Sequence, residues 1–337
     1  MDNQNRLRLG IVGCGYQGGV MATAIQDSRD WQVAACADPD QKAAAHLAGI
    51  AGNVPVYASA DDLLEHPEVD AVYVATSHDA LYECALKAIR AGKHVLAEKP
   101  IGMDEKEAAQ LEDAVTQAGI CFMPGYSFRY IASWQKVYEL LQAGATGEIY
   151  AISGCMSMGP MDEGWGSRPE TGGGALLYVG SHLVDQILWY LADEPVELAA
   201  HIRYRADTHA DETTTFQIRF ARGAVFQGMV SQAGSSFINN VDIFGRKGFI
   251  SLRGGGFNYS VEVESAAMPA YSSPTSLHFT QVQDLRTLMH LPQVAEFAGA
   301  IREHRQPTCT VSDGRRVLKL LDAIVESDRA GRVVRVG

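Results

Sequence analysis

The chain has 337 residues, of which 47% are apolar and 20% are charged, and its formal net charge at pH 7 is −12. This length suits two domains with separate cores, and the acidic balance with scattered Lys and Arg excludes a nucleic-acid surface, which needs concentrated positive charge. No apolar run approaches 18 residues, and the first residues lack the apolar core of a signal peptide, so we expect a cytoplasmic protein without a membrane segment.

The first part of the chain alternates apolar strands with helical segments, which is typical of a parallel sheet wound with helices on both faces. The predicted strands are 7–12, 31–37, 55–57, 71–75, 94–97 and 120–123, and the predicted helices are 41–48, 59–64, 80–91 and 104–118. Residues 1–124 are therefore predicted to form a doubly wound α/β domain.

Residues 125–337 are predicted to form an α+β domain with a large open, mainly antiparallel sheet. The predicted strands are 148–155, 197–204, 213–220, 224–231, 241–244 and 249–252, and the predicted helices are 133–143, a glycine-started helix near Gly172, and 312–330. A large one-layer sheet must hide its second face. We expect that face to be apolar and to pair with a second copy, giving a homodimer or homotetramer.

A glycine-rich turn follows the first strand and precedes a helical run. It reads Gly13-Cys14-Gly15-Tyr16-Gln17-Gly18. In this context Gly13 permits a tight turn, Gly15 lets the backbone approach a pyrophosphate, and Gly18 allows close packing of helix on sheet. The loop, including Tyr16 and Gln17, is predicted to bind a dinucleotide; the alternative is a plain glycine turn in a domain that binds none.

The second strand ends in Asp38, 20 positions after Gly18. A carboxylate at this place accepts hydrogen bonds from both ribose hydroxyls and repels a 2′-phosphate, and no arginine follows it directly. NAD is therefore favoured over NADP as the cofactor. Thr76, Ser77 and His78 follow the fourth strand, where the nicotinamide half of the cofactor would pass.

Lys99 lies in Glu98-Lys99-Pro100, at the carboxyl end of the fifth strand, where ligands of open α/β sheets bind. Desolvation and a nearby cationic nicotinamide would lower the pKa of the amine, and its donors can hold a substrate oxygen at the hydride-transfer point. A solvated surface lysine is the alternative.

A second group of polar residues follows the glycines 172–174. If this segment is one helix, His182 lies four residues and Asp185 seven residues after Tyr178, so the three side chains share a face. That face then carries a phenol, an imidazole and a carboxylate. A buried polar face satisfied internally is the alternative. Four neighbours of these motifs are predicted to line the substrate cleft: Tyr126, Arg129, Trp165 and Arg168.

The six cysteines are widely spaced without a Cys-x-x-Cys motif, which predicts buried, reduced thiols. His, Cys and carboxylate side chains do not recur at the spacings of a metal site, so no metal is predicted.

The chain resembles the glucose-fructose oxidoreductase and inositol dehydrogenase family (Gfo/Idh/MocA) nearly end to end. The resemblance rests on the glycine loop, on residues 91–100 with Glu98-Lys99-Pro100, on the glycines 172–174 with Gly180 and residues 182–185, and on the Gly245–Gly248 hairpin. It implies NAD(P)-dependent oxidation or reduction of a sugar, cyclitol or related hydroxyl compound, a Rossmann domain, and an open-sheet domain that often forms dimers or tetramers. It also implies that Lys99 and His182 are catalytic. Glu98 and Lys99 are also predicted to contact the cofactor.

One position departs from the pattern, because many family dehydrogenases have an aspartate where this chain has Tyr178. The proton carrier is therefore His182, Tyr178 or a relay of both, and we favour His182 as acceptor with Tyr178 as a substrate contact.

Two other functions stay open. One is a glycosidase that retains NAD and eliminates a glycosidic substituent after transient oxidation at sugar C3. The other is a non-enzymatic ligand sensor of the same fold.

Overall fold

The computed structural model describes residues 6–256, 258–280, 284 and 286–336. The chain divides into two compact units. The first contains residues 1–130 and 283–316, and the second contains residues 131–282 and 317–337. The sequence predicts a boundary after residue 124 with everything that follows in the second domain, whereas the described residues of 283–316 group with the first unit.

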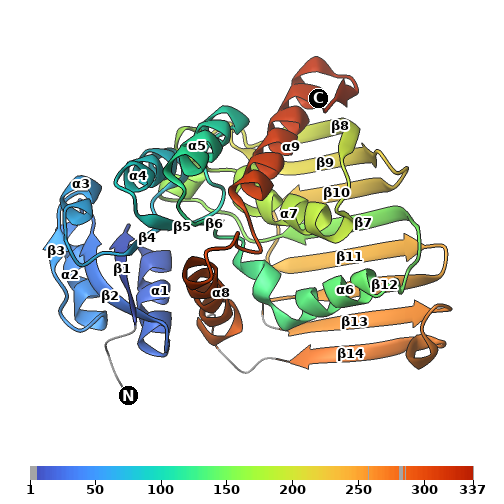
Figure 1. The fold of residues 1–337 in the computed structure, drawn as a ribbon. Coiled ribbons are helices and arrows are strands. Elements are labelled where there is room, and N and C mark those ends of the chain that lie inside the picture. Colours follow the sequence, from blue (N-terminus) through green and yellow to red (C-terminus); the bar gives the residue numbers. More distant parts are fainter. Residues whose placement is uncertain (1–5, 257, 281–283, 285, 337) are drawn as a thin grey trace. The chain divides into compact units, whose positions relative to one another are not determined.

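Within its described residues, the first unit has a six-stranded parallel sheet in the order β3-β2-β1-β4-β5-β6 (Figure 1). The strands are β1 (Leu7–Val12), β2 (Trp31–Ala37), β3 (Val56–Tyr57), β4 (Ala71–Val74), β5 (His94–Ala97) and β6 (Phe122–Pro124). The helices are α1 (Tyr16–Gln26), α2 (Gln41–Ile50), α3 (Ala60–Leu64), α4 (His78–Arg90), α5 (Glu105–Ala118), η2 (Ser127–Tyr130), η7 (Arg286–His290) and α8 (Leu291–Arg302). The predicted doubly wound α/β fold is confirmed.

Local sequence signals set the ends of these helices. Asp104 caps α5 by accepting a hydrogen bond from the Glu107 amide at 2.9 Å, and Glu107 in turn accepts from the Met103 amide at 2.7 Å. Gly119 ends the same helix with a φ of +65°, a conformation that glycine adopts without strain.

Residues 283–316 pack back onto the first unit. The α8 helix covers the start of β2, where the Phe297 ring stacks on Trp31 with centroids 5.3 Å apart. The Trp31 indole nitrogen also donates to the Val294 carbonyl at 2.7 Å. This helix was not predicted, and its contacts join residues more than 260 positions apart.

Within its described residues, the second unit has a nine-stranded sheet in the order β14-β13-β12-β11-β7-β10-β9-β8-β15. The strands are β7 (Ile149–Ser157), β8 (Pro195–Tyr204), β9 (Asp211–Phe220), β10 (Val225–Ser231), β11 (Ile238–Gly245), β12 (Gly248–Gly255), β13 (Asn258–Ser265), β14 (Thr275–Thr280) and β15 (Val334–Arg335). Neighbouring strands are antiparallel except β10 and β7, which are parallel. The large, mainly antiparallel sheet was predicted; β13, β14 and β15 were not.

The helices of this unit are α6 (Ala132–Gln142), η3 (Trp165–Ser167), η4 (Pro169–Thr171), η5 (Leu176–Gly180), α7 (Ser181–Leu191), η6 (Pro269–Tyr271) and the second half of α9 (Val311–Ala330). Figure 1 shows α6 and α7 on one face of the sheet. On that face Phe226 and Phe216 are buried, and a methyl group added at Gly154 would meet Leu183 of α7 at 3.1 Å. The core of this unit therefore lies between its helices and this face of the sheet.

The other face of the sheet carries both polar and apolar side chains. Strand alternation places Gln217, Gln227, Asn240 and Asp242 on it, together with Cys155, Ala199 and Met229. Pairing of this face with a second copy stays a prediction.

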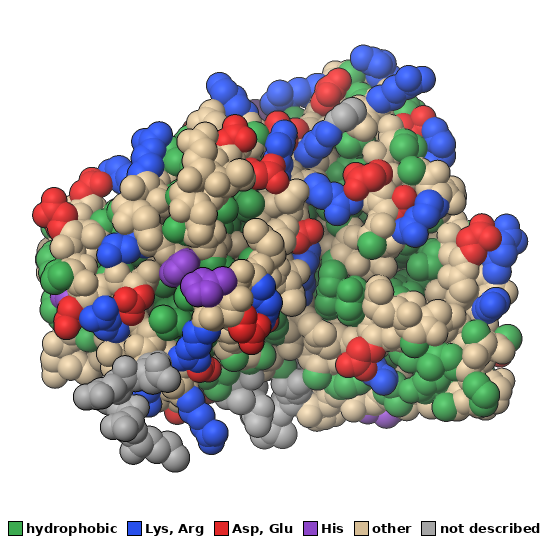
Figure 2. All heavy atoms as spheres, viewed as in Figure 1, with side chains coloured by type: hydrophobic (Ala, Val, Ile, Leu, Met, Phe, Trp, Pro, Cys, Tyr) green, Lys and Arg blue, Asp and Glu red, His purple; other side chains and the backbone are tan. Residues whose placement is uncertain are grey.

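No helix within the described residues is long and apolar enough to span a membrane. On the face shown in Figure 2, Lys and Arg alternate with Asp and Glu without forming a region of one charge sign.

Candidate active site

The glycine loop after β1 is shaped for a dinucleotide. Gly13 has a φ of +94°, and a methyl group there would collide with the Ala75 carbonyl, while one at Gly18 would collide with the Gly13 carbonyl. A methyl group at Gly15 would meet no atom within 4 Å, and α1 begins there without a side-chain cap. The loop is thus packed where it touches the sheet and open at the helix N-terminus, as pyrophosphate binding requires.

Asp38, at the end of β2, is held by two backbone amides. Its Oδ2 accepts from the Cys14 amide at 2.7 Å, and its Oδ1 accepts from the Asp40 amide at 2.7 Å. The carboxylate is therefore fixed beside the glycine loop, where it fits the ribose hydroxyls of NAD.

The other predicted cofactor residues lie at the same edge of the parallel sheet. Tyr16 is exposed and Gln17 is half-buried at the start of α1. Thr76 and Ser77 follow β4, where the Thr76 hydroxyl donates to the Ser77 carbonyl at 3.1 Å, and buried His78 begins α4. These residues share one edge because the carboxyl ends of parallel strands meet there.

Lys99 follows β5 at this edge, next to a buried carboxylate. Glu98 is 6% exposed and its Oε1 accepts a 2.6 Å hydrogen bond from the phenol of Tyr73 on β4. Lys99 is half-buried. Desolvation of its amine lowers the pKa of Lys99 to about 8, and the negative charge of Glu98 offsets part of this lowering. A lysine with this pKa changes protonation near pH 8, as an acid-base role requires, and donates hydrogen bonds below that pH.

The structure places Tyr126 and Arg129 in the interior of the first unit. Tyr126 is fully buried. Arg129 is 4% exposed, and its Nη1 donates to the Thr308 carbonyl at 3.2 Å and lies 3.7 Å from an Asp313 oxygen. These contacts join η2 to Thr308 and Asp313, which follow α8 in the same unit. Arg129 therefore has a structural role there.

Tyr178, His182 and Asp185 lie in the second unit on one helical segment that contains two kinds of turn. Tyr178 is half-buried in the π-helical turn η5, whereas His182 and Asp185 are buried in α7. We predicted a single α-helix, and the π turn changes the angle between Tyr178 and His182. Glycines at the start make this turn possible, because Gly172 and Gly174 have φ values of +85° and +121°.

The two other predicted residues of this unit lie before the glycines. The Trp165 ring is 5.8 Å from the Tyr178 ring, centroid to centroid, at an angle of 44°. Arg168 is exposed. The structure thus brings an indole beside the phenol, an arrangement that can hold the apolar face of a sugar ring.

Two residues that hold parts of the candidate site were not predicted. Tyr73 lies in a buried strand and looks like a core residue in the sequence, although its hydroxyl holds Glu98. Asp211 begins β9, and its Oδ2 accepts from the Leu176 amide at 2.5 Å. No spacing rule links it to a helix 35 residues earlier.

The six cysteines form no disulfide. Cys14, Cys36 and Cys309 are buried, whereas Cys84, Cys121 and Cys155 are half-buried and so differ from the predicted buried thiols. Among the residues that the structure describes, His, Cys, Asp and Glu do not gather in groups of three that could hold a metal ion.

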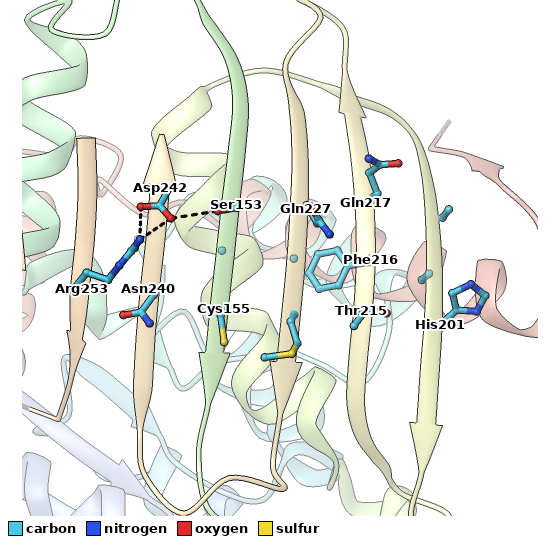
Figure 3. Close-up of a pocket in the computed structure, with 15 residues that line it drawn as sticks. Ser153, Cys155, His201, Thr215, Phe216, Gln217, Gln227, Asn240, Asp242 and Arg253 are labelled. Carbon is cyan, nitrogen blue, oxygen red and sulfur yellow. Dashed lines mark hydrogen bonds and ion pairs between the residues drawn. The ribbon is translucent and has the colours of Figure 1, made fainter. Parts of the chain in front are cut away.

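A depression of about 700 Å³ lies on the open face of the nine-stranded sheet (Figure 3). Arg253 Nη2 lies 2.6 Å from both carboxylate oxygens of Asp242, which in turn lies 3.4 Å from the Ser153 hydroxyl. Its described lining contains none of the predicted site residues. This depression therefore belongs to the open face and not to the predicted active site.

The glycine loop, the aspartate after β2 and the lysine after β5 define an oxidoreductase with an NAD-binding Rossmann domain. Residues 7–126 match the family model described as the oxidoreductase family with an NAD-binding Rossmann fold, and residues 134–251 match the GFO/IDH/MocA C-terminal domain. The chain belongs to the Gfo/Idh/MocA family.

Known proteins resemble it over most of its length. An uncharacterised oxidoreductase of Synechocystis sp. is 28% identical, covering 96% of this chain and 94% of that protein. The 1,5-anhydro-D-fructose reductase of Ensifer adhaerens is 28% identical over 82% of this chain and 83% of its own. The structure of GenD2 from gentamicin A biosynthesis in complex with NAD is 27% identical, with a TM-score of 0.86 and coverage of 98% and 96%.

Proposed function

We propose that this oxidoreductase transfers a hydride between NAD(H) and a hydroxyl-bearing or keto carbon of a sugar, cyclitol or sugar derivative. The observation that carries the proposal is Lys99, whose pKa is lowered to about 8 at the sheet edge that also holds the dinucleotide loop and Asp38. The relatives include a reductase of 1,5-anhydro-D-fructose and an inositol 2-dehydrogenase from Saccharopolyspora erythraea, 29% identical over 59% of this chain.

Each residue has a proposed role. Gly13, Gly15 and Gly18 let the loop approach the pyrophosphate, and Asp38 binds the adenosine ribose. When bound, NAD(H) supplies or accepts the hydride. Lys99 donates a hydrogen bond to the substrate oxygen, which favours the charge that develops there. His182 accepts the hydroxyl proton during oxidation and returns it during reduction.

The remaining site residues are proposed to bind the substrate. Trp165 and Tyr178 present adjacent rings, suited to the apolar face of a pyranose or cyclitol. Tyr178 contacts a substrate hydroxyl, and buried Asp185 lies three residues after His182 on the same face of α7. Arg168, which is exposed, contributes a cationic donor.

The proposal is tested with the purified chain, NAD and NADP, and a panel of sugars, cyclitols and aryl glycosides, with absorbance at 340 nm and released aglycone measured in the same wells. Net NADH with one polyol class is the expected result. Aglycone release without net NADH would assign the redox glycosidase instead. Ligand and cofactor binding without either product would assign a sensor.

We also propose that the open face of the nine-stranded sheet pairs with a second copy. Gln227 lies near the middle of that face, and the half-buried rings of Phe244 and Phe249 lie 5.5 Å apart. Light scattering after gel filtration should give at least a dimer. Gln227→Asp, which would add a buried charge to the proposed interface, should give a monomer. A monomeric wild type would refute the pairing.

A further inference from the structure

The helical segment that carries Tyr178 and His182 has no cap of its own. Ala175, just before the π turn η5, provides no side-chain hydrogen bond, and the first turns of η5 and α7 contain no acidic residue. The first amides of a helix need acceptors, and a negative charge stabilises that end. Such an acceptor must come from elsewhere in the second unit.

Asp211 supplies this acceptor from the start of β9. Its Oδ2 accepts from the Leu176 amide at 2.5 Å, and the Ala175 amide also favours the charged form of this carboxylate. A methyl group at Gly174 would collide with Asp211 Oδ1. The glycine therefore leaves room for the carboxylate to reach the helix start, which gives the glycine run a second purpose besides its backbone conformation.

An irregularity in the sheet turns Asp211 toward the helix. Arg203 pairs with Thr213 but Tyr204 pairs with Asp211, so Glu212 is an extra residue in β9. A bulge of this kind breaks the alternation of faces along a strand. Asp211 would otherwise share a face with Thr213, on the open side of the sheet. The bulge turns Asp211 toward the helix start, and Gly174 leaves the space that its carboxylate needs there. Both features therefore favour the hydrogen bond from Leu176 to Asp211.

The contact has an energetic cost. Burial raises the pKa of Asp211 to about 6, although the backbone amides that bond the carboxylate oppose this shift. The folded chain therefore binds a proton at this site more tightly than the unfolded chain, and the charged carboxylate lowers stability at neutral pH.

We propose that Asp211 is a positioning residue, whose carboxylate fixes the first turn of the helix that carries Tyr178 and His182 and so sets how these side chains meet the substrate. This inference rests on the proposed function of the two residues. Asp211 itself touches backbone amides and takes no part in the chemistry. Loss of the carboxylate is expected to change turnover while the dinucleotide domain stays unaffected.

The test compares Asp211→Ala and Asp211→Asn with Asp207→Asn. Asp207 is an exposed carboxylate on the turn between β8 and β9, bound to Arg205, so its variant makes the same charge change in the same hairpin. Three quantities are measured on the full chain: the NADH dissociation constant, kcat and KM for the substrate found with the panel, and deuterium exchange of the amides of residues 175–182.

In Asp211→Ala we expect at least tenfold faster exchange of the Leu176 amide, at least a tenfold lower kcat, and an unchanged NADH dissociation constant. Asp211→Asn keeps one acceptor and should recover part of the kcat, and Asp207→Asn should match wild type. Normal exchange, or a kcat within twofold of wild type in both Asp211 variants, would overturn the proposal.

The exchange measurement separates two failures. If the wild type oxidises nothing in the panel, the proposed function fails, while faster exchange in Asp211→Ala would still support the anchoring of the helix. If Asp211→Ala does not fold, Asp211→Asn carries the test. A lower melting temperature for Asp211→Asn together with an unchanged kcat would show a purely structural role and contradict the proposal.

Discussion

The phenol of Tyr73 donates a 2.6 Å hydrogen bond to the Glu98 carboxylate, one residue before Lys99. Both partners are buried, and burial with the nearby negative charge raises the pKa of Tyr73 well above its usual value, so the phenol remains a donor at neutral pH. Two neighbouring strands, β4 and β5, thus fix the carboxylate beside the proposed catalytic lysine.

Tyr73→Phe should lower the free energy of unfolding by about 1–3 kcal/mol, because it leaves a buried carboxylate oxygen without its donor. Urea unfolding followed by circular dichroism measures this. Tyr150→Phe, at a residue that is 50% exposed, is the matched control and should change it by less than about 0.5 kcal/mol. Equal effects in the two variants would contradict a role for the Tyr73 hydroxyl.

Lys99→Met should reduce kcat by about 10²–10⁴-fold and leave the NADH dissociation constant within about threefold of wild type. The control is Lys93→Met. Lys93 is also half-buried but precedes β5, at the opposite edge of the sheet, where its amine bonds the Val69 carbonyl at 2.7 Å. Unchanged turnover in Lys99→Met, measured at 340 nm, would remove Lys99 from the mechanism.

The lowered pKa of Lys99 also predicts a pH dependence. The amine is protonated below about pH 8 and neutral above it, so kcat/KM for ketone reduction by NADH should fall as pH rises through about 8. Lys99→Arg, which stays charged, should lose this limb of the profile. A limb that persists in Lys99→Arg would belong to another group and contradict the assignment to Lys99.

The same shift predicts a change in stability. The folded chain holds the Lys99 proton less tightly than the unfolded chain, so burying the charge costs stability below pH 8. This cost disappears as pH rises from about 8 toward the usual lysine value of 10.5. Lys99→Met should therefore be more stable than wild type at pH 7, with a difference that narrows by pH 10. A destabilised variant at pH 7 would contradict this.

Asp38→Ala should lower the ratio of kcat/KM for NAD to that for NADP by at least about tenfold, because a 2′-phosphate would no longer meet a carboxylate. The affinity for NAD should fall as well, since Asp38 also orders the loop through the Cys14 amide. Asp40→Ala is the control. Asp40 caps α2, so its loss should cost about 1 kcal/mol of stability and leave the cofactor ratio unchanged.

Substitutions at Tyr178 and His182 distinguish the proton carrier from the substrate contact. His182→Ala should lower kcat by about 10²–10⁴-fold. Tyr178→Phe keeps the ring beside Trp165 and should mainly raise the substrate KM. A large loss of kcat in Tyr178→Phe with little effect in His182→Ala would assign the proton transfer to Tyr178.

The sequence by itself determined the alternating first domain, the dinucleotide loop with Asp38, and the place of Lys99 at the end of a strand. These features are local: a glycine pattern, an apolar run and the residue that follows it set the backbone within a few positions. The same holds for the helix ends at Asp104 and Gly119.

Only the tertiary structure decided the return of 283–316 to the first unit, the hydrogen bond from Tyr73 to Glu98, and the cap that Asp211 provides. Each joins residues distant in sequence, and the packing that selects them leaves no periodic trace in the chain. The bulge at Glu212 and the π turn before α7 act in the same way. Each moves side chains away from the regular period of a strand or a helix. Hydrophobic patterns in a sequence predict only those regular periods, so neither feature could be predicted.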